Sequence, residues 1–251
     1  VPLDGAFPLS PSLDSLGPLA RSVEACIAAD AVMAGKEPAA LTPLSLAGLR
    51  IGVPRGRLME HCDPAVTAGF EQALKRLAAA GARIADISID DLLLSLREAT
   101  RVASIAALEG AEIHADWLST GAKVAVDRHV SGGLGRALQV PAVGYIRTMR
   151  RRAELAAAMD ERLSSFDLMV LPTTPIVAQP IADVLADERH GDRIEGLLLR
   201  NTQVANQFDL CALTLPVPGT SLPVGLMLVG RHGHDRRVLS AGLAVETLLR
   251  G

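Results

Sequence analysis

The first third of the chain shows the clearest alternation of apolar and polar stretches. The apolar runs 49–53 and 83–89 predict two short strands, because each is rich in aliphatic residues. One apolar face at helical spacing lies between them, formed by Val66, Phe70, Leu74 and Leu77. Asp63 suits the N-cap of this helix, Pro64 its first turn and Gly81 its left-handed end. A strand, a helix and a strand with short joins predict a right-handed parallel crossover.

Helices and short strands alternate over the rest of the sequence. We expect helices at 22–34, at 92–118 in two pieces, at 143–166, at 194–207, and from Asp235, as the cap, to about 249. We expect strands at 167–171, 212–215 and 224–229. The glycine-containing segment 126–141 is interpreted as a loop or a break between helices, and the charged segment 187–192 as exposed. These elements predict an α/β fold with a mixed, mainly parallel sheet flanked by helices, in a single domain over residues 1–251.

The longest uncharged stretch does not predict a membrane-spanning helix. Residues 211–230 have about the length that a bilayer requires, but prolines and glycines interrupt them. We expect two buried strands joined by a turn there. No signal peptide is visible, and the three distant cysteines, Cys26, Cys62 and Cys211, are typical of a reducing compartment. The sequence therefore predicts a soluble, cytoplasmic protein without membrane contact.

The composition narrows the range of partners. Hydrophobic residues make up 49% of the 251 residues and charged residues 21%, as in ordinary globular proteins. The net charge of −3 and the scarcity of aromatic residues (four Phe, one Tyr, one Trp) argue against a nucleic-acid partner, which needs clustered basic charge or stacking side chains. The arginine-rich stretch 147–152 is followed by Asp160 and Glu161, so we interpret it as a solvated helix face.

Local motifs of nucleophilic catalysis and of cofactor binding are missing from the sequence. No Gly-x-Ser-x-Gly occurs, and Ser131-Gly132-Gly133 follows no predicted strand, so we interpret that segment as a flexible loop. The turn at 54–57 lacks the glycine spacing of a dinucleotide site. The lysines are Lys36, Lys75 and Lys123, and none lies in a phosphate-binding loop. We therefore expect no cofactor.

Two short clusters bring residue types of metal ligands together, at 60–63 (EHCD) and at 232–235 (HGHD). Each cluster ends in an aspartate where a helix is predicted to begin, so helix capping accounts for that residue. Zinc would need further ligands from elsewhere in the chain. We expect no metal at either place.

An ordered set of segments resembles the amidase signature family of serine-dependent amide hydrolases. The set consists of GAFPLS at 5–10, SLDSLGPLARSV at 12–23, LRIGVP at 49–54, Tyr145-Ile146, DLMVLPTTP at 167–175, Arg200-Asn201-Thr202 with Asn206, ALTLP at 212–216 and LPVGLMLVG at 222–230. The resemblance covers essentially the whole chain. It implies a single domain with a large mixed sheet, of which this chain is the later portion. It also implies hydrolysis of a carboxamide to a carboxylate and ammonia or an amine.

The resemblance further implies a serine–lysine mechanism whose catalytic residues this chain lacks. In the family an unprotonated lysine takes a proton, through a second serine that follows a cis peptide bond, from the serine that attacks the carbonyl. The family's lysine and its Gly-Gly-Ser loop both precede the segment that matches residues 1–5. Either this chain is the later part of a longer amidase, or it is a truncated descendant without chemistry. In both cases we expect the 251 residues alone to be inactive.

The resemblance assigns this portion of the family to the substrate pocket. The candidate substrate-binding residues are Asp14, Thr173, Thr174, Arg200 and Asn201. Arg200 would pair with a substrate carboxylate or carbonyl, and a salt bridge to Glu195 or to a neighbouring helix is an equally open alternative. Asp14 also fits a cap at the entry of a helix, and the two threonines also fit turn formation.

Two other functions stay open beside amide hydrolysis. The first is an amidotransferase subunit that releases ammonia from glutamine, and the second is a non-catalytic binding or scaffold domain. The expected partner is a small-molecule amide, with no nucleic acid and no membrane. The sequence leaves a homo-oligomer open.

Overall fold

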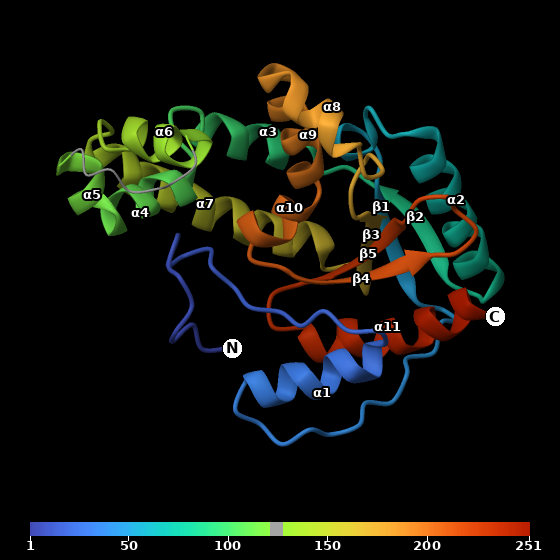
Figure 1. Cartoon of the computed structure of the whole chain (residues 1–251). Coiled ribbons are helices and arrows are strands. Elements are labelled where there is room, and N and C mark those ends of the chain that lie inside the picture. Colours follow the sequence, from blue (N-terminus) through green and yellow to red (C-terminus); the bar gives the residue numbers. More distant parts are fainter. Residues whose placement is uncertain (121–127) are drawn as a thin grey trace.

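A five-stranded sheet in the order β2-β1-β3-β5-β4 lies at the centre of the computed structural model, which describes residues 1–120 and 128–251 (Figure 1). Its strands are β1 Arg50–Pro54, β2 Arg83–Ile87, β3 Leu168–Pro172, β4 Cys211–Val217 and β5 Val224–Gly230. Strand β1 is parallel to β2 and β3, whereas β5 is antiparallel to both β3 and β4. Four strands thus share one direction and β5 opposes them. The mixed, mainly parallel sheet is confirmed.

The helices surround this sheet and account for about half of the chain. They are α1 Val23–Met33, α2 Pro64–Ala79, α3 Asp90–Ala99, α4 Ile105–Ile113, α5 Ala115–Thr120, α6 Arg128–Ala137, α7 Ala142–Leu163, α8 Ile181–Ala186, α9 Glu188–Arg200, α10 Thr202–Gln207 and α11 Asp235–Arg250, with one short 3-10 turn at Arg57–Met59. The predicted helices at 22–34 and 143–166 are confirmed as α1 and α7. The segment 92–118 forms three helices rather than two pieces, and the charged residues 187–192 cap and begin α9.

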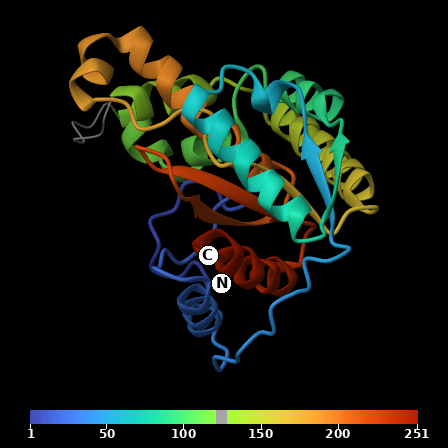
Figure 2. The same ribbon diagram turned by 90° about the vertical axis from the view of Figure 1, so that its right-hand side faces the viewer.

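Alternate residues of the central strands enter two different cores. Leu168 and Val170 of β3 pack in one cluster with α2 and α11, whereas Met169 and Leu171 pack in the other with α3 and α7. Successive side chains of a strand point to opposite faces, so a strand covered on both sides reads as a continuous apolar run. Figure 2 shows α11 below the sheet and α1 below α11. Helix α1 is therefore an outer layer on that face.

A third, smaller cluster holds the helices farthest from the sheet. Leu134 and Ala137 of α6 pack against Ala111 of α4, and α7 links this lobe to the sheet (Figure 1). The prediction of a loop or break at 126–141 is wrong where α6 lies. Its glycines suggested a loop, but the buried face formed by Leu134 and Ala137 supplies tertiary packing, which overrides weak helix propensity. Ser131-Gly132-Gly133 lies within this helix rather than in a loop.

The two predicted capping aspartates do not cap their helices. Asp63 occupies the N-cap position of α2, but its Oδ2 accepts a hydrogen bond from the Val177 N–H at 3.0 Å. Its own N–H donates to the Pro175 carbonyl at 2.8 Å, so Asp63 fixes the loop after β3 to the start of α2. Asp235 is the first residue of α11, after His234 at the cap position. Gly81 has φ +93°, which confirms the predicted left-handed end of α2.

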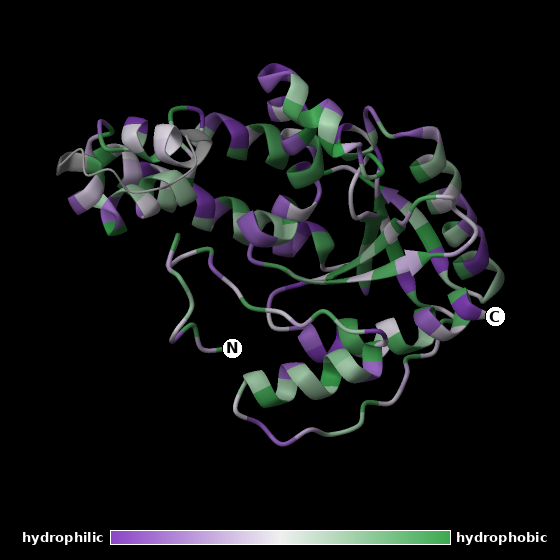
Figure 3. Cartoon of the chain, viewed as in Figure 1, coloured by the Kyte–Doolittle hydropathy of each residue, from purple (hydrophilic) through white to green (hydrophobic). Residues whose placement is uncertain are grey.

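The uncharged run 211–230 forms β4, a turn and β5, as predicted, but the expectation that both strands are buried holds for β5 alone, because β4 lies at the edge of the sheet. Figure 3 shows that hydrophobic residues predominate along these strands and β3. Among the described residues, no helix has both the length and the apolar character needed to cross a membrane.

Candidate functional site

Four of the five predicted substrate-binding residues gather near the carboxyl end of β3. Thr173 and Thr174 follow the last residue of the strand directly. The Thr173 N–H donates to the Gly225 carbonyl at 2.9 Å, and its Oγ1 lies 3.1 Å from the hydroxyl oxygen of Thr214 on β4. A Cβ at Gly225 would lie 2.5 Å from the Thr173 hydroxyl oxygen, so only glycine permits this approach. Thr173 thus links β3 to both β5 and β4.

Thr174 closes the turn that follows β3. Its hydroxyl donates to the carbonyl of Ile176 at 2.9 Å, two residues further on. This is the turn-forming geometry that the sequence offered as an alternative. Both threonines are partly exposed, so each hydroxyl oxygen is within reach of solvent at this edge of the sheet.

Arg200 and Asn201 join the loop after β1 to the end of β3. The Arg200 guanidinium donates to the carbonyls of Glu60 (2.6 Å) and Leu58 (2.8 Å), and to the Asn201 side chain (3.0 Å). The Asn201 side chain is completely buried and donates to the Pro172 carbonyl at 2.8 Å. Two segments that lie over a hundred residues apart in sequence are thereby held together.

The guanidinium of Arg200 therefore bonds to main-chain carbonyls rather than to Glu195. No ion pair between these two residues exists among the described contacts, so the predicted alternative of an Arg200–Glu195 salt bridge is not the arrangement found. Burial lowers the pKa of Arg200 from its ordinary value. Burial also raises the pKa of the nearby Cys62 thiol, against the effect of the Arg200 charge. A half-buried cation thus stands at the carboxyl edge of the parallel strands.

Asp14 lies apart from these four residues, in the irregular segment before α1. Its Oδ2 accepts hydrogen bonds from the main-chain N–H groups of Leu9 (2.9 Å) and Ser10 (3.0 Å). The carboxylate therefore closes its own turn. The helix-entry cap offered for Asp14 is wrong, because Ser22 caps α1 by accepting from the Ala25 N–H at 3.2 Å.

A polar cluster that sequence reasoning missed holds this same segment. Glu109 on α4 is only 9% exposed, and its carboxylate accepts hydrogen bonds from the Ser10 hydroxyl (2.6 Å), the Ser12 N–H (3.0 Å) and the Tyr145 hydroxyl (2.7 Å). Burial opposes the ionisation of Glu109, but these donors hold its pKa below its ordinary value. The hydrogen bond to Glu109 raises the pKa of Tyr145 to about 12. The cluster anchors the chain near Ser10 to α4 and α7.

The two candidate metal clusters bring no third ligand together. Among residues 1–120 and 128–251, no group of three His, Cys, Asp or Glu side chains is placed to hold a metal ion. In the first cluster Asp63 is bonded to the Val177 N–H. In the second, His232 lies beside Asp209, with Nδ1 at 3.3 Å from a carboxylate oxygen. Both arrangements are accounted for by protein contacts.

Of the described lysines, Lys36 and Lys75, neither is buried as the base of serine–lysine chemistry needs to be. Lys36 and Lys75 are exposed, and Lys123 lies outside the described residues. A lysine is neutral at pH 7 only where burial or neighbouring positive charge lowers its pKa by several units.

The chain is similar to known proteins along almost its whole length. The chain is 30% identical to 2-amino-5-chloromuconic acid deaminase of Comamonas testosteroni, with 99% of this chain and 54% of that protein covered. It is 28% identical to indoleacetamide hydrolase of Allorhizobium ampelinum, covering 99% of this chain and 57% of the relative. A crystal structure of an amidase matches with a TM-score of 0.82 and 27% identity, over 99% of this chain and 56% of that one. The chain thus spans about half the length of these relatives.

A family model described as Amidase matches residues 1–239, which is almost the entire chain. The matched range contains the carboxyl end of β3, the Arg200–Asn201 pair and the β4–β5 hairpin described above. By sequence and by fold, this chain belongs to the amidase family.

Proposed function

We propose that this chain forms the substrate-side portion of an amide hydrolase, which converts a carboxamide to a carboxylate and ammonia or an amine. The observation that carries the proposal is the family match over residues 1–239. The name of the indoleacetamide hydrolase, a relative with 28% identity, supports hydrolysis of an amide bond. Because the chain spans about half of its relatives, activity is assigned to an assembly and not to these 251 residues alone.

The proposed chemistry is the serine–lysine mechanism, with the catalytic serines and the lysine supplied by polypeptide outside this chain. The nucleophilic serine oxygen adds to the amide carbonyl, and its proton passes through the second serine to the neutral lysine. The leaving ammonia or amine takes up a proton as the carbon–nitrogen bond breaks. Water then cleaves the resulting ester to the carboxylate and restores the serine. The exposure of Lys36 and Lys75 supports the assignment of the base to another segment.

Within this proposal Thr173, Thr174, Arg200 and Asn201 form one wall of the substrate pocket, and Asp14 lies apart from them. Thr173 and Thr174 present hydroxyl groups at the carboxyl end of β3, and Arg200 places a positive charge beside them. Asn201 fixes Arg200 and the end of β3 through its buried hydrogen bonds. Asp14 shapes the turn that leads from Ser10 toward α1. Asp14 and Asn201 are therefore proposed as positioning residues and Arg200 as the group that meets the substrate.

We further propose a cytoplasmic location, a single α/β domain for this chain and a small-molecule amide as its substrate. The three cysteines are free thiols in the structure, which supports a reducing compartment. The location is tested by fractionating cells and following the chain with an antibody. Recovery outside the cytoplasm would contradict it.

The experiment that tests the function compares two preparations. The first is this chain alone. The second is this chain expressed together with the part of the Comamonas relative that precedes its match with this chain. We call that part of the relative the upstream polypeptide. Both preparations are assayed for ammonia release from simple aliphatic and aryl amides and from glutamine. We expect hydrolysis of the simple amides only by the pair.

Each alternative function has its own outcome in this assay. Turnover restricted to glutamine would favour an amidotransferase subunit, and a soluble pair without any turnover would favour a scaffold domain. Hydrolysis by this chain alone, blocked by a serine-directed phosphonate, would contradict the proposal.

A further inference from the structure

Residues 8–14 form no helix or strand, yet side chains of distant helices hold their backbone in place. Glu109 on α4 accepts hydrogen bonds from the Ser10 hydroxyl (2.6 Å) and from the Ser12 N–H (3.0 Å). Asn206 on α10 donates to the Leu13 carbonyl at 2.6 Å. An irregular segment keeps one path only where other groups satisfy its polar backbone. The path of this segment is therefore fixed from outside.

Glu109 is the centre of this arrangement. Its second carboxylate oxygen accepts a hydrogen bond from the Tyr145 hydroxyl on α7 at 2.7 Å, so one side chain connects α4, α7 and the segment. Hydrogen bonds to a carboxylate are short and about twice as strong as neutral ones. Ser10 is buried, so loss of the carboxylate would leave its hydroxyl without this acceptor.

Helix α4 also contacts the segment closer to the beginning of the chain. The His114 Nε2–H donates to the Pro8 carbonyl at 3.1 Å, and the His114 ring stacks on Phe7 with 5.3 Å between the ring centroids. A Cβ at Gly110 would lie 2.9 Å from the side chain of Leu9, so glycine permits this close approach. The segment thus lies directly against α4.

The segment shares its supporting helices with the proposed substrate wall. Helix α10 follows directly on Arg200 and Asn201, and its Asn206 donates to the segment. Arg152 on α7 donates to the carbonyls of Asn206 (3.2 Å) and Gln207 (3.0 Å), so α10 is joined to α7 as well. A displacement of the segment is consequently a displacement relative to the residues that meet the substrate.

We propose that Glu109 is a positioning residue of the hydrolysis, which fixes residues 8–14 and thereby sets the distance between the nucleophilic serine and the amide carbonyl. This inference rests on the proposed function, in which the serine lies in polypeptide that precedes the match with this chain. The segment is the part of this chain that leads toward that polypeptide. A misplacement of about 1 Å can lower the rate of a reaction about 100-fold, so a distant anchor of this kind affects catalysis.

A fused chain, in which the upstream polypeptide is joined to residue 1 by a peptide bond, tests this role. We expect Glu109→Gln to lower kcat by a factor of about ten or more and to leave KM within about a factor of two. The reason is that the amide keeps one acceptor oxygen but loses the second acceptor and the charge. Steady-state kinetics on simple amides measure both constants.

Labelling of the serine by a serine-directed phosphonate separates positioning from folding. Intact mass gives both the labelled fraction and the rate constant of labelling. A residue that only stabilises the fold would reduce the labelled fraction and leave the rate constant of the folded molecules unchanged. We expect Glu109→Gln to lower the rate constant by about the same factor as kcat.

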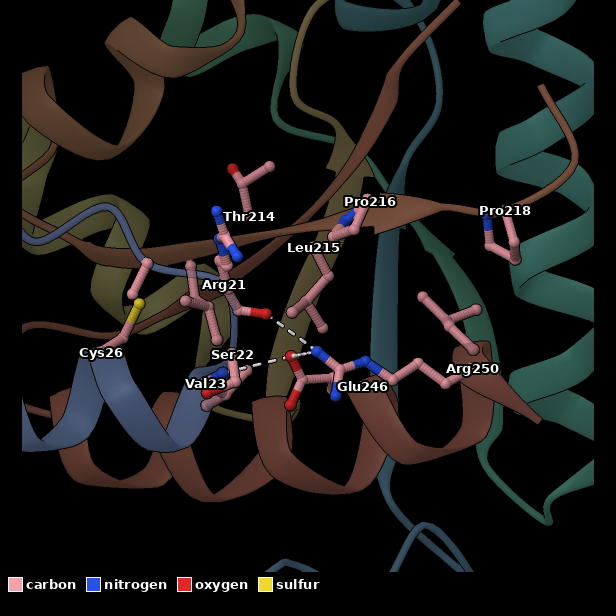
Figure 4. Close-up of a pocket in the computed structure, with 13 residues that line it drawn as sticks. Arg21, Ser22, Val23, Cys26, Thr214, Leu215, Pro216, Pro218, Glu246 and Arg250 are labelled. Atoms are coloured by element: carbon pink, nitrogen blue, oxygen red, sulfur yellow. Dashed lines mark hydrogen bonds and ion pairs between the residues drawn. The ribbon is translucent and has the colours of Figure 1, made fainter. Parts of the chain in front are cut away.

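The matched control for Glu109 is a carboxylate that holds the other end of the irregular segment. Glu246 on α11 accepts hydrogen bonds from the Val23 N–H (3.2 Å) and from Arg250 (2.9 Å), where α1 begins (Figure 4). Glu246→Gln removes the same charge at a place that does not border residues 8–14. We expect it to leave kcat and the rate constant of labelling unchanged.

A second pair of variants removes hydroxyl groups from α7. Tyr145→Phe deletes one donor to Glu109 and keeps the ring, so the fold is conserved and we expect kcat to fall about threefold or more. The Thr148 hydroxyl donates to the Ala99 carbonyl at 3.1 Å and does not contact the segment. Thr148→Val should therefore retain the kcat of the unsubstituted fused chain.

Three outcomes would overturn the inference. The first is an unchanged kcat and labelling rate constant in Glu109→Gln, and the second is an equal loss in Glu246→Gln. The third is a smaller labelled fraction at an unchanged rate constant, which would make Glu109 a purely structural residue.

Failure of the inference is distinguishable from failure of the proposed function, because labelling requires no amide turnover. A fused chain that is labelled, and more slowly in Glu109→Gln, but hydrolyses no amide would support the positioning role and reject the proposed function. Amide hydrolysis with the same kcat in Glu109→Gln would do the reverse. A fused chain that is neither labelled nor active would overturn both.

Discussion

The two edges of the sheet differ in length, charge and cover. Strand β2 has five residues, two of them charged, and Asp86 pairs with Arg55 at 3.2 Å. Strand β4 has seven residues, none of them charged, and borders two cavities. Natural proteins protect open edges with charge and short length, because an unprotected edge recruits other strands. Strand β2 therefore has the features of a protected edge, and β4 lacks them.

The two ends of the sheet also differ in how far helices cover their strands. The core between α2, α11 and the sheet is continuous from β1 to β5, and the central strands are buried on both faces. At β4, helix α11 packs on one face, whereas Ala212, Thr214 and Pro216 on the other face are exposed. Substitutions in the covered core should thus destabilise this chain more than substitutions of the exposed side chains of β4.

The largest effect should come from shortening a fully buried leucine in the core between α2, α11 and the sheet. Leu228 of β5 is completely buried and lies opposite Leu213 of β4, which is only partly buried. We expect Leu228→Ala to lower the free energy of unfolding of this chain by about 2–5 kcal/mol and Leu213→Ala by about 1 kcal/mol. Urea denaturation followed by circular dichroism measures both. Equal losses would show that β4 is as well enclosed as β5 and would break the comparison.

The next largest effect is expected on catalysis, from a substitution of Arg200 near the carboxyl end of β3. In the pair formed with the upstream polypeptide, we expect Arg200→Ala to lower kcat/KM by a factor of about ten or more, as for a lost charged hydrogen bond. Steady-state kinetics on the preferred amide measure this change. Arg200→Lys keeps the charge but not the fork of donors, and should recover part of the loss. Unchanged kinetics in Arg200→Ala would remove Arg200 from the substrate pocket.

Asp167 should make the folding stability of this chain depend on pH in the acid range. Its carboxylate accepts from Arg50 (2.8 Å to the N–H) and from Arg237 (2.8 Å), so it joins β3, β1 and α11. The hydrogen bonds from Arg50 and the charges of both arginines lower the pKa of Asp167 to about 2. A depressed pKa stabilises the folded state above the unfolded pKa of about 4, and this stability is lost as the pH falls toward 2.

We expect Asp167→Asn to cost about 1 kcal/mol at pH 7, a value reduced for the exposure of both arginines, and to flatten the decline in stability between pH 4 and 2. Denaturation at a series of pH values measures both changes. Asp86→Asn on the exposed edge β2 serves as the control and should leave the profile nearly unchanged. If the stability of Asp167→Asn fell between pH 4 and 2 as steeply as that of the original chain, Asp167 would be excluded as the source of the decline.

The smallest effect should be found at the two edges of this chain alone. Ala85→Lys and Ala212→Lys each replace an exposed alanine, so we expect changes in unfolding free energy below about 0.5 kcal/mol. Thermal or urea unfolding of the isolated chain provides the comparison. A large loss in Ala212→Lys alone would mean that this side chain packs within the chain, and the edge would no longer be open.

The regular part of the fold was predictable because its signals are local. The apolar run of β3 predicts a strand, Asp63-Pro64 predicts the start of helix α2, and Gly81 predicts the end of that helix. Helix α6 was not predictable, because its glycines disfavour a helix and the packing against α4 that stabilises it is a tertiary contact. Asp63 likewise occupies the predicted position but bonds to a loop more than a hundred residues away.

The candidate site was predictable only in part. The resemblance identified Thr173, Thr174, Arg200 and Asn201, and the structure brings these four residues to one end of β3. Glu109 was not predictable, since its donors Ser10 and Tyr145 lie 99 and 36 residues away in the sequence. A buried carboxylate has no local signature when all its side-chain partners come from other elements.

The most direct test of the account is the release of ammonia from simple amides, measured for this chain alone and for this chain together with the upstream polypeptide. We predict hydrolysis by the pair and none by this chain alone. Equal hydrolysis by the two preparations would contradict the claim that the catalytic serines and the lysine lie outside these 251 residues.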